Sequence, residues 1–294
     1  MSLVINHNMM AMNANRNLGA AYDSLGVSTR RLSSGLRVGT AADDAAGLAI
    51  RELMRADVKT LNQGIRNAND AISMIQTADG ALGVIDEKLI RMKELATQAA
   101  TGTYNSDQRL IIDSEYQAMA SEITRIANAT DFNGIHLLNG NLSGANSAHN
   151  GNGITSTGPV KVHFGSGNDS AEDYYYVSIN TSTASALGVG LAANNSISTQ
   201  ALAQQSLDKL NNAIISKDKI RANLGALQNR LENTITNLSV QAENVQASES
   251  RISDVDVATE MTEFTKNQIL TQAAVAMLGQ ANGMPRLAMQ LIGG

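Results

Sequence analysis

The sequence predicts a mainly α-helical protein: a long antiparallel coiled-coil or helical-bundle rod with both termini paired, plus a small β-rich excursion in the middle of the chain. Three observations support this fold class. Apolar residues recur at seven-residue spacing over most of the chain. The 294 residues include only two prolines and 3% aromatic residues, which permits long helices and argues against a thick core. Two helix-breaking stretches lie at similar distances from the two ends of the sequence. We therefore expect the chain to run along the rod in one direction and to return in the other, so that both ends build one structure.

A predicted helix over residues 1–36 opens the chain. Its narrow apolar stripe consists of three leucines at seven-residue spacing: Leu18, Leu25 and Leu32. The first break follows in LSSGLRVGTAADDAAGLAIRELMRA, residues 32–56, where serines and glycines are stop signals. Three residues of this stretch can cap a new helix: Thr40, Asp43 and Asp44. We expect a short linking helix over residues 44–56.

The longest helical pattern runs from about residue 58 to residue 100. Its apolar ladder has members seven residues apart: Leu61, Ala68, Ile75, Leu82, Leu89 and Ala96. A second column, Ile65 and Ile72, continues one residue out of step, at Ile85, Met92 and Ala99. This shift indicates a stutter in the heptad pattern. After a turn near Gly102, another amphipathic helix is predicted over residues 106–129.

Residues 131–198 are predicted to form turns, loops and short strands instead of helices. Two Asn-Gly pairs, at residues 133–134 and 139–140, predict tight turns and a hairpin. Two short strand-like runs, VKVHF and YYYVSI, then lie among Gly-, Ser- and Asn-rich stretches. We expect an excursion with long loops and modest stability of its own.

The helical pattern returns at Thr199 and runs to about Ser250. Its heptad ladder has Lys217 as the lone polar member: Leu210, Lys217, Leu224, Leu231, Leu238, Val245 and Ile252. The second break, SESRISDVD, follows at residues 248–256. A last helix over about residues 256–294 carries Leu and Met every seventh residue, with small alanines between them: Leu270, Ala274, Met277, Ala281, Met284 and Leu291. Such alternation favours close helix packing, and Pro285 is expected to kink the helix.

Motifs for catalysis or cofactor binding are missing from the sequence. Without cysteine there is no thiolate ligand or cysteine nucleophile, and the four histidines are not at metal-ligand spacing. The Asp43–Asp44 pair fits helix capping better than catalysis, since adjacent helical side chains diverge. A net charge of -5 without a basic cluster argues against nucleic acid or a membrane surface as partner. No secretory signal peptide or membrane span is apparent. We therefore expect no enzyme activity, no metal and no cofactor.

Five blocks of the sequence resemble bacterial flagellin. They are MSLVINHN, LSSGLRVGTAADDAAGLAI, QTADGALGVIDEKLIRMKELATQ, DFNGIHLLNG and the closing helix, and the resemblance covers roughly residues 1–142 and 197–294. It implies three domains. Residues 1–40 with 256–294 would form a terminal coiled-coil domain in the filament core. Residues 41–142 with 197–255 would form a helical rod domain with a β-hairpin, and residues 143–196 a variable, outward-facing excursion.

The resemblance also implies a function and partners. The chain would self-assemble into the extracellular flagellar filament for swimming, after export by the flagellar secretion apparatus without a cleaved signal. Its partners would be copies of itself, an export chaperone, and the cap and hook-junction proteins. Two alternatives remain: a hook-filament junction protein of the same superfamily, and an enzyme carried in the variable region.

The RMKELATQ block has two interpretations. In similar flagellins the matching positions are contacted by the animal innate receptor Toll-like receptor 5, here Arg91, Glu94, Leu95 and Glu115. These charges can equally serve the packing between neighbouring subunits.

The terminal segments also carry apolar residues off their stripes: Leu3, Val4, Phe264 and Ile269. Pairing within one chain would leave these residues in water. We therefore expect residues 1 to about 40 and 256–294 to be largely disordered in the monomer and helical after assembly.

Overall fold

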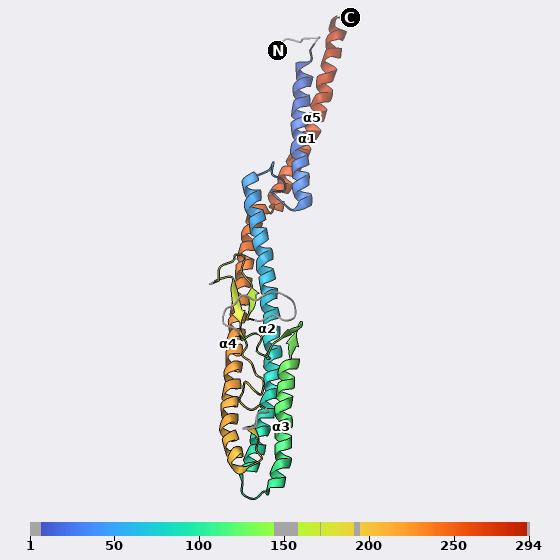
Figure 1. Cartoon of the computed structure of the whole chain (residues 1–294). Coiled ribbons are helices and arrows are strands. Elements are labelled where there is room, and N and C mark those ends of the chain that lie inside the picture. Colours follow the sequence, from blue (N-terminus) through green and yellow to red (C-terminus); the bar gives the residue numbers. More distant parts are fainter. Residues whose placement is uncertain (1–6, 144–157, 171, 191–194, 293–294) are drawn as a thin grey trace. The chain divides into compact units, whose positions relative to one another are not determined.

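The computed structural model describes residues 7–143, 158–170, 172–190 and 195–292, with side chains in the last helix described as far as Arg286. Leu3 and Val4 lie outside the described residues. Within the described ranges the chain forms five helices and two small antiparallel sheets (Figure 1). It divides into two compact units, Met1–Val58 with Glu243–Gly294, and Lys59–Ala242. The mainly helical fold predicted from the sequence is confirmed.

The first unit is built on two helices from opposite ends of the chain, α1 (Met9–Ser34) and α5 (Val257–Ile292), which lie side by side (Figure 1). The Asn8 side chain caps α1 by accepting the Ala11 N–H at 3.0 Å. Gly35 ends the helix with a φ of 73°, a conformation that glycine adopts without a side-chain clash, and its N–H reaches Arg31 O. The predicted pairing of the two termini is confirmed.

The second unit contains most of α2 (Ala45–Ala100) and α4 (Gln200–Ser253), together with α3 (Ser106–Ala129). The expected bounds of α3 are confirmed, and a capping box between Asn105 and Gln108 fixes its start. The separate linking helix over residues 44–56 was wrong, because α2 continues without a break. The sequence MRADVKT after it contains no glycine or proline that would stop a helix.

The two principal ladders form the core of the second unit. On α2, the six predicted members from Leu61 to Ala96 are all buried. So are the residues after the stutter: Ile85, Met92 and Ala99. On α4, the buried members are Leu210, Lys217, Leu224, Leu231 and Leu238. The heptad periodicity therefore located the core of this unit correctly.

The first Asn-Gly pair forms the predicted hairpin. β1 (Asp131–Phe132) pairs with β2 (Ile135–His136) across a two-residue turn. Asn133 and Gly134 both have positive φ, 51° and 80°, as the tightest hairpin turns require. The second pair makes a turn without strands, in which Gly140 has a φ of 99°.

The excursion is more closely packed against the helices than its sequence suggested. β3 (Val160–His163) pairs with β4 (Tyr174–Val177), and Val162 and Val177 are buried in the same cluster as the helical ladders. Phe164 packs with Leu61 and Leu238. Gly64 is necessary here, because a Cβ at this position would lie 2.0 Å from the carbonyl oxygen of Phe164. Modest stability of its own remains a prediction for the excursion, whereas the packing of β3, β4 and Phe164 against the helices was not predicted from the sequence.

Candidate assembly surface

The two breaks in the helical pattern meet within the first unit. Leu36 forms an antiparallel bridge with Asp254. On either side of it, Arg37 N–H donates to Ser253 O at 2.7 Å and Val255 N–H donates to Gly35 O at 3.0 Å. Backbone pairing thus joins residues more than 200 positions apart and fixes where α1 and α5 begin to run together. The mirrored positions of the breaks predicted this meeting.

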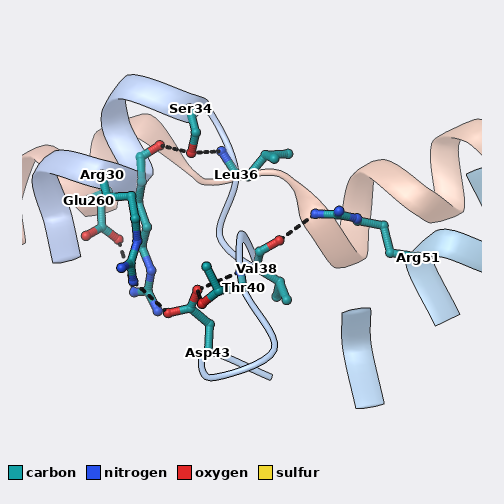
Figure 2. Close-up of polar contacts among 9 residues, drawn as sticks. Arg30, Ser34, Leu36, Val38, Thr40, Asp43, Arg51 and Glu260 are labelled. Carbon is teal, nitrogen blue, oxygen red and sulfur yellow. Dashed lines mark hydrogen bonds and ion pairs between the residues drawn. The ribbon is translucent and has the colours of Figure 1, made fainter. Parts of the chain in front are cut away.

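Polar side chains hold the loop that follows (Figure 2). The Asp43 carboxylate accepts the Thr40 hydroxyl at 2.8 Å, the Thr40 N–H at 3.0 Å and the Arg30 guanidinium at 3.1 Å. These hydrogen bonds, chiefly that of the Thr40 hydroxyl, lower the pKa of Asp43 below its ordinary value. Asp44 caps α2 by accepting the Gly47 N–H at 2.9 Å. The predicted capping role is confirmed for Asp44, whereas Thr40 and Asp43 hold the loop before α2 and do not cap the helix.

Two arginines in the same unit were not singled out from the sequence. Arg51 is only 8% exposed and donates to the Val38 carbonyl at 2.6 Å. Arg31 lies 3.7 Å from Glu260, which is buried at the start of α5 (Figure 2). Neither arginine lies on the predicted stripe of Leu18, Leu25 and Leu32, so the apolar pattern gave no signal for them.

The seam between α1 and α5 follows a regular heptad pattern on both helices. On α1, the least exposed positions alternate by three and four residues: Ala11, Ala14, Leu18, Ala21, Leu25, Ser28 and Leu32. On α5 they are Glu260, Phe264, Asn267, Thr271, Ala274, Leu278 and Ala281. The seam is made largely of small and polar residues, so it buries little apolar surface.

Only some residues of the predicted terminal stripes lie in the seam between α1 and α5. Leu18, Leu25 and Leu32 lie in the seam, with Ala274 and Ala281 on the other helix, and Met284 is half-buried. Leu270 and Met277 instead are 49% and 64% exposed. Leu291 lies in the last turn of α5, where side chains fall outside the described part. The expectation that Phe264 is left in water was wrong, because it occupies a seam position.

The physical reason is that the apolar residues of α5 are spread around the helix and do not form one stripe. A ladder of Leu and Met therefore did not identify the face that packs within the chain. That face contains Glu260, which pairs with Arg31, the small residues Thr271 and Ala274, and the larger Phe264 and Leu278. Leu270 and Met277 are exposed instead.

The apolar residues left outside the seam are numerous. The exposed large apolar residues of α5 include Val257, Met261, Ile269, Leu270, Val275 and Met277, and those of α1 include Met9, Met10, Met12 and Tyr22. Beside the seam lies a groove of about 670 Å³, with Met10 and Ala14 of α1 on one wall and Leu270 and Met277 of α5 on the other. Extended exposed apolar surface of this kind marks a binding surface for another protein.

A charged cluster lies on the second unit. Arg91 donates to Glu115 at 2.8 and 3.0 Å and to Glu94 at 3.0 Å, so it links α2 and α3. Its pKa is raised by these hydrogen bonds, that of Glu115 first. All three side chains are about half exposed, whereas Leu95 is 2% exposed and belongs to the core. The cluster predicted from RMKELATQ thus consists of three surface residues. Leu95 lies beneath them and is not available for surface contact.

Among the described residues, no group of three or more His, Asp and Glu residues could hold a metal ion. In the same part of the chain, no helix combines the length and apolarity needed to cross a membrane.

Comparison with known proteins agrees with this architecture. The family model of the bacterial flagellin N-terminal helical region matches residues 5–143, and that of the C-terminal helical region matches residues 207–292. Flagellin FlaB2 of Treponema pallidum (strain Nichols) is 41% identical over 293 residues, which cover 99% of this chain and 100% of the relative. Flagellin of Halalkalibacterium halodurans is 42% identical over 290 residues, with 99% and 100% covered.

One solved structure shares the fold alone. It is described as a flagellar hook-associated protein from Vibrio parahaemolyticus, with a TM-score of 0.55 and 15% identity over 72% of this chain and 100% of that chain. The matches to both helical regions and to full-length relatives decide the family. This chain belongs to the bacterial flagellins.

Proposed function

We propose that this chain is the repeating subunit of a flagellar filament outside the cell, and that copies join through the exposed faces of α1 and α5. The observation that carries the proposal is the apolar surface left beside a small, partly polar seam, with Leu270 and Met277 on the wall of the groove. A relative from Treponema phagedenis, 41% identical over 293 residues, is named a flagellar filament core protein. Self-assembly would cover apolar residues that one chain leaves in water.

We also propose the three domains that the resemblance to flagellin implies. Residues 1–40 with 256–294 form the filament core, residues 41–142 with 197–255 form the rod, and residues 143–196 face outward. The two family models support this division, because the matched ranges leave residues 144–206 between them. The chain has a structural role without catalysis, in keeping with a family of structural proteins. Its other partners are an export chaperone, the cap and the hook-junction proteins.

The rival function is that of a hook-filament junction protein. The likeness to the hook-associated structure supports only a shared fold, at 15% identity. Relatives named flagellin or filament core protein match at about 40% identity over nearly the whole chain. The filament subunit is therefore the better supported function.

Arg91, Glu94 and Glu115 form a second proposed contact surface. Their ion pairs keep three charged side chains in fixed positions at the α2–α3 surface, about half exposed. Such a surface suits either a neighbouring subunit or Toll-like receptor 5. Receptor binding would use these three residues, since Leu95 is buried.

Electron microscopy after a salt jump tests the proposed function. Purified wild-type chain is expected to form long filaments, whereas a hook-junction protein would give only discrete particles. Leu270→Gln with Met277→Gln should prevent filament growth, because polar amides would enter an apolar contact. The matched control, Gln268→Ala with Gln280→Ala, changes two exposed polar residues of the same helix and should polymerise. Normal filaments from the Leu270 and Met277 variant would refute the role of this groove.

A further inference from the structure

One charged residue lies inside the apolar ladder of α4. Lys217 is only 2% exposed, although its ladder neighbours are leucines. Its Nζ lies 2.6 Å from Asp86 Oδ1 of α2 and 2.7 Å from Asp218 Oδ1. One turn farther along α4, Arg221 donates to both carboxylate oxygens of Asp79, at 2.7 and 3.1 Å. Two cations of α4 thus pair with two carboxylates of α2.

The two principal ladders alone do not determine how α2 and α4 align. These two ladders repeat every seven residues, so a slip of seven residues along the axis brings their apolar members opposite one another again. Such a slip moves one helix by about 10 Å. A single buried polar residue in a heptad pattern is a known means of fixing register, at some loss of stability.

The charged residues remove this degeneracy in both directions. If α4 slips so that Lys217 moves seven positions toward the end of α2, it comes opposite Lys93, and like charges repel. If α4 slips the other way, Lys217 comes opposite Asp79, but Arg221 then comes opposite Ile72 and loses its carboxylate. Only the observed register satisfies both cations.

We propose that Lys217 and Asp86, together with Arg221 and Asp79, form a register lock that selects one alignment of α4 against α2. The lock contributes specificity rather than stability, because replacing a buried ion pair by apolar residues is often neutral or stabilising. It acts between helices of one chain. Its test therefore does not depend on whether the chain polymerises.

Distance measurement between two spin labels tests the lock. The chain has no cysteine, so labels are placed by Gln76→Cys on α2 and Asn211→Cys on α4, both exposed positions. In the observed register these residues are offset by about 24 Å along the axis. The otherwise unchanged chain should give one distance. Lys217→Met should add a second population whose distance is longer by about 10 Å. In this variant the slip that brings position 217 opposite Lys93 no longer causes charge repulsion. The opposite slip stays unfavourable, because Arg221 would still lose its carboxylate partner.

Three further variants make the outcome decisive. Lys219→Met removes an exposed lysine from the same helix and should keep the single distance. Exchanging the charges, by Lys217→Asp with Asp86→Lys, should keep one dominant distance at the original value, provided that Asp218→Asn is added so that two carboxylates are not adjacent. Circular dichroism should show that replacing both partners, by Lys217→Met with Asp86→Leu, gives a chain that melts at or above the temperature of the parent chain. A single unshifted distance in Lys217→Met, a lower melting temperature of the Lys217→Met, Asp86→Leu variant, or a broad distribution in the exchanged chain would overturn the lock.

Discussion

Asp43 illustrates at the scale of one residue how charge holds the loop between α1 and α2. Its pKa lies below the ordinary value of 3.8, because the carboxylate accepts hydrogen bonds from Thr40 and faces Arg30. A depressed pKa in the folded state means that the carboxylate stabilises the fold above the unfolded pKa. That contribution is lost as the pH falls through the folded pKa.

The first prediction therefore concerns Asp43→Asn. This variant should be less stable than the wild type at neutral pH. The difference should begin to shrink as the pH falls below about 3.9, the unfolded pKa, and should vanish once the pH is below the depressed pKa of the folded state. Denaturant unfolding at a series of pH values measures it. Asp23→Asn, at an exposed position of α1, is the control and should show no such pH-dependent difference. A constant difference from pH 7 to pH 2 would show that the charge of Asp43 has no part in holding the loop.

Leu82 and Leu231 test the ladders of the second unit. Both side chains are fully buried, so truncation to alanine removes apolar contacts and leaves a cavity. Leu82→Ala and Leu231→Ala are each expected to lower the free energy of unfolding by about 2–5 kcal/mol. Val84→Ala, at a position that is 43% exposed, should change it by less than about 0.5 kcal/mol. Equal effects at Leu82 and Val84 would contradict the assigned core.

At the scale of elements, the helices and buried faces that were predicted correctly are those with a clear local sequence pattern. α3 was predicted with its observed bounds because a turn signal and a clear apolar face agree, and the structure adds a capping box at its start. The buried faces of α2 and α4 were predicted because a heptad of large residues alternates with polar ones. The seam face of α5 was not, because Leu270 and Met277 compete with smaller residues on a helix whose apolar residues are spread over several faces. Burial of Leu95 beneath Arg91 likewise depends on α3 packing over α2.

The excursion required long-range contacts that short patterns do not encode. Its strands were found, but the packing of Phe164 on Leu61 depends on the glycine at residue 64 of another element. Within a helical sequence pattern, a glycine indicates only a less stable helix. It does not indicate which other segment packs against it, so this contact could not be predicted from the sequence.

This packing changes what deletions should do. Gly158 N–H donates to Asn141 O at 2.6 Å, so the described residues on either side of 144–157 lie close enough to be joined by a short linker. Replacing residues 144–157 by Gly-Ser-Gly should leave the melting temperature nearly unchanged, since loop length has a small entropic effect. Replacing residues 143–196 should lower it by several degrees, because Leu61 and Leu238 lose Phe164. Equal melting temperatures for both deletions would show that the strands do not support the helices.

On the scale of the whole molecule, the chain distributes its apolar surface unevenly. The second unit buries large residues on three helices, whereas the seam of α1 and α5 contains Ser28, Asn267, Thr271 and Glu260 among its least exposed positions. Ordering a residue costs about 1–2 kcal/mol of backbone entropy, which a small seam offsets poorly. Opening of α1 and α5 should therefore require much less free energy than opening of α2 and α4.

The last prediction follows from this difference. In the free monomer, residues 7–40 and 256–292 should exchange their backbone amide hydrogens rapidly, while the ladder regions of α2 and α4 stay protected. Assembly should slow exchange at both ends, because neighbouring copies cover residues such as Ile269 and Met277. Deleting residues 270–294 should preserve the protected rod but abolish polymerisation, whereas the 144–157 deletion, as control, should polymerise. Protected ends in the monomer, or filaments from the truncated chain, would mean that the α1–α5 pair is stable alone and that assembly does not depend on covering its exposed face.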